Sequence, residues 1–319
     1  MKYFSLLIVL FVIACAKIEI EENPLYFFWN EMDRKYVYFN EKQVDWDSVR
    51  NTLHRYNPDI KSDLVSGFTN MVLLLRDRHV WINTGEENIT YSLDDYFFSS
   101  VDINFYSSGK FEENDTYCIA QLAGGVVYME IKTFYAPFVD FEKTIKKYDY
   151  SNGIIMDIRH NGGGFYDNAF ELASNFISGE HTVLYQKFKT GARHNDFTDF
   201  KPMVLKGFNR FPGAKIILLI DRMTYSSANS FACIMKNFTN TVLVGDKTGG
   251  GGGISARGIL PNGWSYSISE NALFDMNYQS LENGLLPDYQ VIFDKERHEQ
   301  EKPRHNQLDF AYKLLLGKH

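Results

Sequence analysis

Two adjacent serines, Ser226 and Ser227, stand where an apolar run of the sequence gives way to a helical pattern. The run over residues 214–221 is typical of a buried strand, and the residues after the serines indicate a helix. A serine at such a junction can cap the helix through its side chain. It can also be a nucleophile, provided that a base, an orienting group and an oxyanion site lie close by. Position alone leaves both roles open.

A glycine turn occupies the equivalent place one strand earlier. Asp157 ends an apolar strand, and three glycines, the last of them Gly164, then open a helix. Glycines permit positive φ angles, so this turn can present a backbone N–H to a substrate or can be a simple turn. Neither G-x-G-x-x-G nor the P-loop lysine pattern is present, which argues against a phosphate-binding loop. A second glycine cluster, from Val244 to Gly253, predicts a mobile loop at the same sheet edge.

A serine nucleophile needs a general base, and histidine is the most frequent one. The chain has eight histidines, and most of them stand in polar, loop-like surroundings where exposure is expected. His79 and His160 stand next to predicted strand ends. Either of them can be the base, and either can equally be structural.

The N-terminal part of the chain predicts a small helical module over residues 25–75. Apolar side chains recur there at helical spacing. Asp45 or Asp47 is a candidate cap for one helix, and Ser62 is a candidate cap for the next.

The remainder, residues 76–319, predicts one α/β domain. From Gly124 onward strands alternate with helices, which indicates a mostly parallel sheet covered by helices. Asn262 and Gly263 favour a hairpin near the end of this domain.

Composition narrows the class of protein. The chain has 319 residues, of which 45% are hydrophobic and 23% charged, as in an ordinary globular protein with a substantial core. The net charge is −7, and no dense stripe of lysine and arginine appears. Both observations argue against binding of nucleic acid.

Residues 1–15 predict export from the cytoplasm. One lysine precedes an apolar run that is too short to span a bilayer, which is the pattern of a secretory signal. Its end resembles a bacterial lipobox, in which Cys15 becomes the lipidated first residue; the alternative is an ordinary signal peptide with a chance cysteine. Residues 16–24 then form a charged tether. The expected location is the bacterial cell envelope, on its periplasmic or outer-surface side, with Cys15 as the membrane anchor.

Cys118 and Cys233 can pair in an oxidising compartment or can be small buried apolar residues. Cys233 falls in an apolar helical stretch, which favours the second interpretation. Their spacing does not match a metal site.

Five motifs in a fixed order resemble the S41 peptidase family, the tail-specific or C-terminal processing proteases. They are D-x-H, D-x-R-x-N-x-G-G, T-x-S-S-A-x-x-F, V-G-D-K-T-G-G and E-N-G-x-x-P-D, spread over residues 68–293. The resemblance implies an α/β fold with a ClpP/crotonase-like β-superhelix core, here preceded by the helical module. It also implies serine peptidase chemistry that needs no metal or cofactor.

The resemblance assigns roles one residue at a time. The family nucleophile in T-x-S-x-A falls on Ser226. Ser227, as the following residue, then gives one oxyanion N–H. Gly163, in the glycine pair after D-x-R-x-N, gives the other.

The base separates two branches of the family. The better-known branch uses a Ser/Lys dyad, whose lysine corresponds here to about Gly251, while Lys247 aligns with a different family lysine. The tricorn-like branch uses an early histidine and a glutamate before the final P-D, which correspond to His79 and Glu282. This second branch is the nearer one, although it has a serine where this chain has Arg78.

The expected activity is therefore that of a serine-type endopeptidase acting on proteins or peptides at the cell envelope. The alternative is a catalytically inactive surface lipoprotein that binds peptides or apolar ligands on the same fold. An α/β-hydrolase is not indicated, because G-x-S-x-G is missing. The oligomeric state stays open.

Overall fold

The computed structural model describes most of the chain after the predicted signal peptide. The described ranges are 23–93, 101–191, 193–302 and 304–318. Cys15 and nearly all of the predicted tether lie outside them. Contacts divide the chain into two compact units. The first unit contains the residues up to Leu93 together with Lys187–Asp199 and Gly253–Ala272, and the second contains the remainder.

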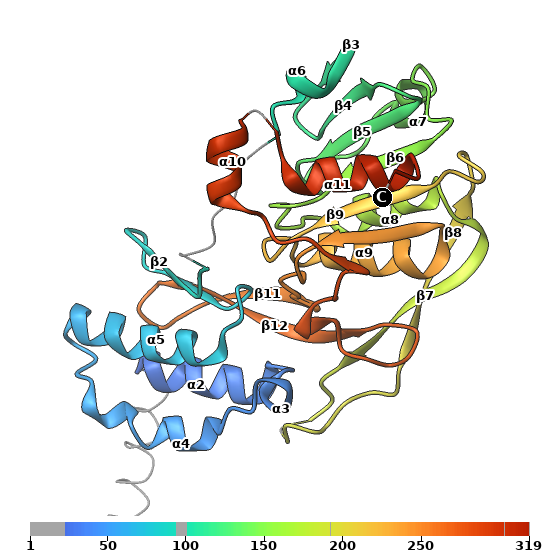
Figure 1. Ribbon diagram of the computed structural model, residues 1–319. Helices are drawn as coiled ribbons and strands as arrows, with labels where there is room; N and C mark the ends of the chain where they lie inside the picture. The colour runs from blue at the N-terminus through green and yellow to red at the C-terminus, as the bar shows by residue number, and fades with distance from the viewer. Residues whose placement is uncertain (1–22, 94–100, 192, 303, 319) are drawn as a thin grey trace, which may run out of the picture. The chain divides into compact units, whose positions relative to one another are not determined.

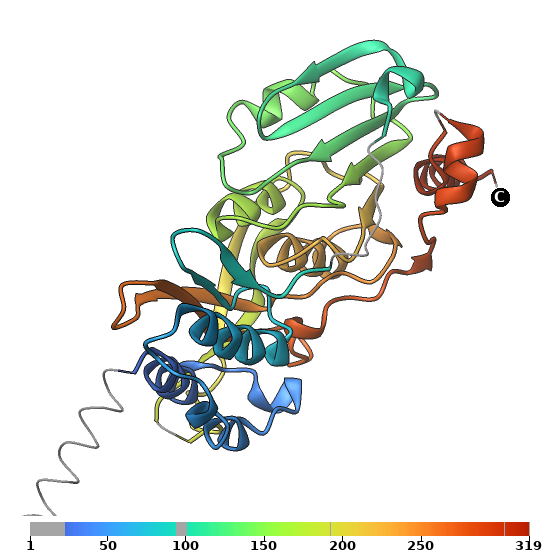
Figure 2. The ribbon, with the colours of Figure 1, turned by 90° about the vertical axis from the view of Figure 1, so that its left-hand side faces the viewer.

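The first unit combines the N-terminal helices with short antiparallel strands (Figure 2). Its elements are α2 (Pro24–Lys35), α3 (Phe39–Lys42), α4 (Trp46–Arg50), η1 (Leu53–Arg55), α5 (Lys61–Leu75), β1 (Trp81–Asn83), β2 (Asn88–Thr90), β11 (Gly253–Ile259) and most of β12 (Ser265–Phe274). Strand β12 pairs with β1 on one side and β11 on the other, and β1 also pairs with β2. The pair β11–β12 confirms the hairpin predicted around Asn262 and Gly263.

Tryptophans tie the helices of this unit together. The indole N–H of Trp29 donates to the Trp46 carbonyl at 2.9 Å, and the indole N–H of Trp46 donates back to Trp29 at 3.1 Å. Both rings are buried, so each N–H finds the partner that a buried indole requires. This reciprocal pair fixes α2 against α4.

The helix caps in this unit were predicted in part. Asp45 caps α4, because its carboxylate accepts a hydrogen bond from the Ser48 N–H at 3.1 Å. The prediction for Ser62 is wrong. Helix α5 begins at Lys61 after Ile60, so Ser62 already lies within the first turn.

The second unit is built on a seven-stranded sheet (Figure 1). Its elements are α6 (Ile103–Tyr106), β3 (Ser107–Glu113), β4 (Tyr117–Leu122), β5 (Val126–Ile131), α7 (Phe141–Ile145), β6 (Gly153–Asp157), α8 (Tyr166–Ser174), most of β7 (Ser178–Phe188), β8 (Lys201–Phe208), β9 (Ile216–Ile220), α9 (Ser227–Phe238), β10 (Thr241–Gly245), η2 (Leu281–Asn283), β13 (Tyr289–Gln290), α10 (Lys295–Glu301) and α11 (Asn306–Leu315). The strand order is β13-β10-β9-β6-β5-β4-β3. The strands from β13 to β5 are parallel, and β4 and β3 are antiparallel.

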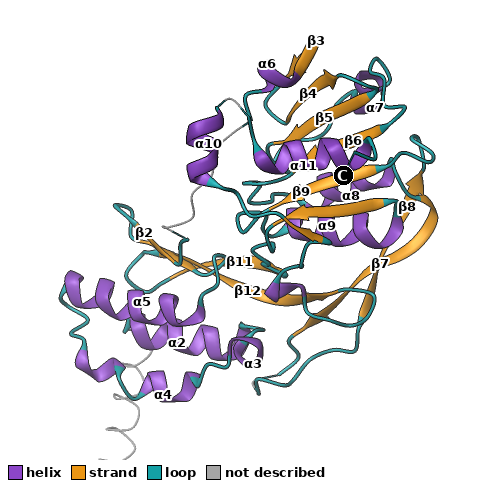
Figure 3. Ribbon diagram, in the orientation of Figure 1, coloured by secondary structure: helices purple, strands orange, loops and turns teal. Residues whose placement is uncertain are grey.

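Alternating side chains explain why helices cover both faces of this sheet (Figure 3). In β6, Ile154 and Met156 pack into one core cluster with residues of α8 and α9, whereas Ile155 packs into another with residues of α11. A strand with apolar residues at every position must be buried on both faces. The mostly parallel, covered sheet predicted from the sequence is therefore confirmed.

Two local features depart from the sequence-based prediction or refine it. Strand β13 has only the two residues Tyr289–Gln290, and the hairpin of β7 and β8 had not been predicted. Cys118 and Cys233 are both buried and unpaired, which confirms that they are small core residues.

Within the described ranges no helix has the length and apolar character to cross a membrane.

Candidate active site

Three parallel strands end at the same edge of the second unit's sheet. The turn after β6 carries Gly163, the turn after β9 carries Ser226, and the glycine segment follows β10. In such sheets ligands bind beyond the carboxyl ends of the strands. The sheet topology thus brings together three segments that lie far apart in the sequence.

Ser226 has a strained backbone at the start of α9. Its φ and ψ are 58° and −128°, a combination that residues with a side chain rarely adopt. Holding a residue there costs about 1–3 kcal/mol, and such strain persists only where the surrounding structure enforces it. The Ser226 N–H donates to the Gly250 carbonyl at 2.9 Å, which is part of that enforcement. Its side chain makes no capping hydrogen bond, so Ser226 is not a side-chain cap.

The glycine turn after β6 packs directly against the Ser226 turn. A Cβ atom on Gly163 would lie 2.9 Å from the Ser226 Cβ and 3.0 Å from the Ser227 nitrogen, so only glycine fits. The Ser227 N–H lies in the first turn of α9, where backbone donors have no partner within the helix. The Gly163 N–H donates to the side-chain oxygen of Asn161 at 2.9 Å. The Gly163 N–H can donate to an oxyanion only if Asn161 shares or releases it.

The glycine segment after β10 contacts both the Ser226 turn and Glu282. Gly252 donates its N–H to the Glu282 carboxylate at 3.0 Å, and Glu282 is 4% exposed. A Cβ on Gly250 would lie only 1.9 Å from the Glu282 carbonyl oxygen, and one on Gly251 would lie 2.3 Å from the Tyr225 ring. The segment is glycine-rich because the chain has no room there for side chains.

A buried phenol also borders the nucleophile. The hydroxyl of Tyr166, the first residue of α8, lies beside the hydroxyls of Ser226 and Ser230. Burial raises the pKa of Tyr166 to about 12, the two serine hydroxyls oppose this increase, and the Glu282 charge adds to it. Tyr166 is therefore protonated at neutral pH and can donate a hydrogen bond.

His79 belongs to the first unit, where it lies just before β1. Its ring is largely buried, and burial lowers the pKa of the imidazole, while the charge of Asp77 raises it. Asp77 is 1% exposed and accepts the His79 backbone N–H at 2.8 Å. Asp77 is part of the D-x-H motif, but the motif alone does not assign it a role.

The other two candidates for the base have different surroundings. His160 in the second unit lies with its Nε2 at 3.3 Å from a carboxylate oxygen of Asp221, and its backbone N–H donates to the same side chain. Lys247 is exposed, and within the described chain its ammonium group makes no hydrogen bond or ion pair. The proposed base of a serine nucleophile must lie within hydrogen-bond reach of the serine hydroxyl, and nothing in the described contacts of the Lys247 side chain indicates such a role.

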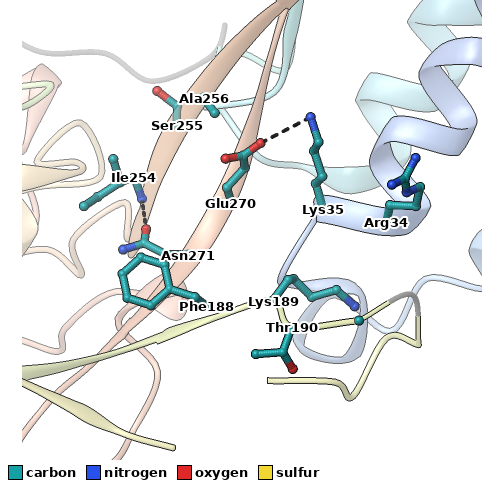
Figure 4. Close-up of a pocket in the computed structure, with 11 residues that line it drawn as sticks. Arg34, Lys35, Phe188, Lys189, Thr190, Ile254, Ser255, Ala256, Glu270 and Asn271 are labelled. Atoms are coloured by element: carbon teal, nitrogen blue, oxygen red, sulfur yellow. Dashed lines mark hydrogen bonds and ion pairs between the residues drawn. The ribbon is translucent and has the colours of Figure 1, made fainter. Parts of the chain in front are cut away.

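A cavity of about 550 Å³ lies within the first unit. Figure 4 shows its walls, which are the end of α2, the residues that follow β7, and strands β11 and β12. Arg34, Lys35 and Lys189 bring positive charge to the lining, and Glu270 brings negative charge. Lys35 forms ion pairs with both Glu31 and Glu270, at 2.7 and 3.7 Å. The cavity is thus polar and of mixed charge, with Ile254 and Phe188 as its apolar parts.

The family model for peptidase family S41 matches residues 125–291. The chain belongs to peptidase family S41. This is a family of serine peptidases, and the match contains Ser226, Ser227, Gly163 and Glu282.

Relatives and solved structures agree with this assignment. The chain is 25% identical over 140 residues to the chloroplastic carboxyl-terminal-processing peptidase 1 of Arabidopsis thaliana; this covers 43% of the chain and 27% of that protein. It therefore spans about a quarter of that relative. A candidate peptidase from Parabacteroides merdae has 27% identity and a TM-score of 0.85, with 93% of this chain and 97% of the other covered. Mature CPAF complexed with lactacystin has a TM-score of 0.66 at 10% identity, covering 93% and 98% of the two chains, and shows the fold alone.

The S41 motifs acquire distinct physical roles in this chain. In D-x-R-x-N, Asp157 and Arg159 form a buried ion pair at 2.5 Å, and Asn161 holds both the Gly163 N–H and the Ile131 carbonyl. These residues shape the glycine turn. Within the described ranges no group of three histidine, cysteine or acidic side chains is placed to hold a metal ion.

Proposed function

We propose that this S41 protein is a serine endopeptidase in which Ser226 is the nucleophile. The observation that carries the proposal is the strained Ser226 backbone at the end of β9, packed against Gly163 and the start of α9. A serine held in this way at a strand-to-helix turn presents its hydroxyl at the sheet edge, as in other nucleophile turns. Strain at a single residue is a feature of functional sites.

The proposed reaction begins with attack of the Ser226 Oγ on a peptide carbonyl. His79 takes the hydroxyl proton as general base and then gives it to the leaving amine as general acid. Water, again activated by His79, hydrolyses the acyl-enzyme. Glu282 has the proposed role of supporting this network from the glycine segment, where its carboxylate accepts the Gly252 N–H.

The proposed oxyanion donors are the backbone N–H groups of Ser227 and Gly163. Their proximity in the second unit supports this role, since a Cβ on Gly163 would reach the Ser227 nitrogen. Losing one such donor typically costs about 3 kcal/mol of barrier. Asn161, which accepts the Gly163 N–H, would control whether that donor is available.

The packing of the glycine segment argues against the Ser/Lys dyad. The family lysine would fall at about Gly251, where even a Cβ atom would overlap the Tyr225 ring. Lys247 aligns with a different family lysine, and its side chain is exposed. His79 is the better candidate, because its lowered pKa keeps the ring neutral at physiological pH.

The proposed substrates are extended peptides or unfolded protein segments. Strand β11 pairs only with β12 among the described strands, so its other edge can receive a peptide strand. Ile254 and Ser255 of β11 also line the cavity of mixed charge. This combination suits a peptide with both apolar and polar side chains.

The second candidate is an inactive protein that binds peptides or apolar ligands. It is favoured by one observation, namely that the Gly163 N–H is already engaged by Asn161. A peptide-cleavage assay on wild type, Ser226→Ala and Ser227→Ala separates the two functions. The proposal requires cleavage that disappears in Ser226→Ala and persists in Ser227→Ala; full activity of Ser226→Ala would refute it.

We also propose that the protein is anchored in the bacterial cell envelope through a lipid on Cys15. The proposal is supported by the charge, length and ending of the first 15 residues alone. Metabolic labelling with a fatty acid should mark the wild type but not Cys15→Ser. Equal labelling of both proteins would exclude this anchor.

A further inference from the structure

We infer that Asp77 is a positioning residue for His79, an inference that rests on the proposed role of His79 as the base. Asp77 would hold the imidazole in one orientation and stabilise the positive charge that develops when His79 takes the Ser226 proton. This gives the D-x-H motif of this chain a second functional member. The tricorn-like pattern has a serine at the position of Arg78, and Arg78 cannot fill the role of that serine beside the base. Asp77 is the residue that we assign to this role.

The Asp77 carboxylate is fixed by three donors from three segments of the first unit. One oxygen accepts the backbone N–H of His79 at 2.8 Å. The other accepts the Tyr36 hydroxyl at 3.1 Å and the Ser269 hydroxyl at 2.9 Å. Tyr36 directly follows α2, and Ser269 belongs to β12. The N-terminal helices and strand β12 therefore fix this carboxylate together.

The position of the carboxylate suits a partner for the imidazole. One Asp77 oxygen lies 4.0 Å from the His79 Nδ1, which is about 1 Å longer than a hydrogen bond. Such contacts are often long in the absence of substrate and shorten in the reacting complex. A small rotation of the ring would let Nδ1–H donate to Asp77 while Nε2 receives the proton.

The charges around His79 also single out Asp77. Burial opposes the protonated imidazole, and Arg78 and Lys42 oppose it further. The Asp77 charge acts in the opposite direction and favours the charged ring. Lys42 is itself held at the carbonyl of Arg76 by a 3.1 Å hydrogen bond. Without Asp77, the burial of the ring and the charges of Arg78 and Lys42 would disfavour the imidazolium that catalysis requires.

Glu282 has different contacts in the second unit. Its carboxylate accepts the Gly252 N–H, and its backbone packs against Gly250. These contacts stabilise the glycine segment that binds the Ser226 N–H. We therefore assign the positioning of the base to Asp77 and the support of the nucleophile turn to Glu282.

The test compares Asp77→Asn with Glu282→Gln, two changes that remove a charge and keep the shape. NMR titration of the His79 ring is the first readout, because it does not depend on activity. Asp77→Asn should lower the His79 pKa, and Glu282→Gln should leave it nearly unchanged. The second readout is the pH profile of kcat/KM, whose plateau should fall about 10²–10⁴-fold in Asp77→Asn, the range for loss of an orienting carboxylate.

Two further variants keep the inference testable if Asp77→Asn does not fold. Tyr36→Phe and Ser269→Ala each remove one hydrogen bond to Asp77 while leaving its charge in place. Each should shift the His79 pKa and lower kcat/KM by about threefold to tenfold. An unchanged His79 pKa and unchanged kcat/KM in the folded variants would overturn the inference. Failure of the proposed function itself would look different, since the wild type would then cleave no peptide while the pKa shift remained.

Discussion

The two regions that hold the proposed nucleophile and the proposed base are built in different ways. Around Ser226 the backbone does the positioning: a residue with positive φ is held by glycines that approach too closely for any side chain. Around His79 side chains do it, through a buried carboxylate that accepts hydrogen bonds from Tyr36 and Ser269. The region around Ser226 belongs to the second unit, and the region around His79 belongs to the first unit.

This difference predicts how each region responds to mutation. A backbone fit fails abruptly, because one added methyl group must displace a neighbouring main chain. A set of side-chain hydrogen bonds weakens gradually, because each bond contributes only about 1 kcal/mol. The nucleophile region should therefore respond to mutation in an all-or-none manner, and the base region in graded steps.

The largest effect is expected from removal of the nucleophile. Ser226→Ala should lower kcat by about 10⁴–10⁶-fold, as in serine peptidases that lose their nucleophile. Ser227→Ala is the matched control, since its proposed contribution is a backbone N–H that alanine retains. Steady-state cleavage of an unstructured protein measures both. Equal losses in the two variants would remove the distinction between the adjacent serines.

The next effect tests the backbone fit. Gly250→Ala places a methyl group against the Glu282 carbonyl at a φ of 80°. Steric overlap and the positive φ together should destabilise the fold by about 2–4 kcal/mol. Urea denaturation measures this change. Gly162→Ala is the control, because no atom lies within 4 Å of the added Cβ and its φ is not in the positive range.

An intermediate effect is expected from pH. Burial lowers the pKa of His79 from its ordinary value of 6.5, and the base must be neutral. The pH of half-maximal activity should therefore lie below 6.5, and activity should fall by up to tenfold per unit at still lower pH. The same lowered pKa makes the free energy of unfolding decrease as pH drops below about 6.5. The reason is that the unfolded chain takes up the His79 proton at a higher pH than the folded protein does. A half-maximal pH clearly above 6.5 would contradict a buried His79 base.

The smallest effect is expected at Tyr166. Tyr166→Phe removes the hydroxyl beside Ser226 and Ser230 but keeps the ring and its contact with Phe170. Loss of a hydroxyl that can donate to the reacting serine should lower kcat/KM by about threefold to tenfold. Phe170→Leu is a control for packing on the same helix. If the two variants lose activity equally, packing alone explains the effect of Tyr166.

The fold was largely predictable because its signals are local. Continuous apolar strands such as residues 216–220, alternating with helices, indicate a covered parallel sheet before any contact is known. The long hairpin of β7 and β8 was not predicted. Its exposed and buried residues alternate irregularly, and its register shifts between Thr182 and Leu184. The cap at Ser62 was predicted wrongly because a serine one position inside a helix looks the same in sequence as a cap.

The candidate site was predictable where motif and geometry coincide. Ser226 and Gly163 follow strand ends, so their convergence could be inferred from topology. The need for glycine at positions 250, 251 and 252 could not, because it depends on Tyr225 and Glu282 from other segments. The role inferred for Asp77 depends on Tyr36 and Ser269, which are 41 and 192 residues away along the chain. No local pattern contains such information.

The central claim is that Ser226 is a nucleophile activated by His79, and labelling by a fluorophosphonate probe tests it most directly. Mass spectrometry of digested wild type should locate the adduct on Ser226. Labelling should disappear in Ser226→Ala and His79→Ala and persist at the wild-type rate in Lys247→Ala. An adduct on another serine, or labelling lost in Lys247→Ala but retained in His79→Ala, would contradict the account.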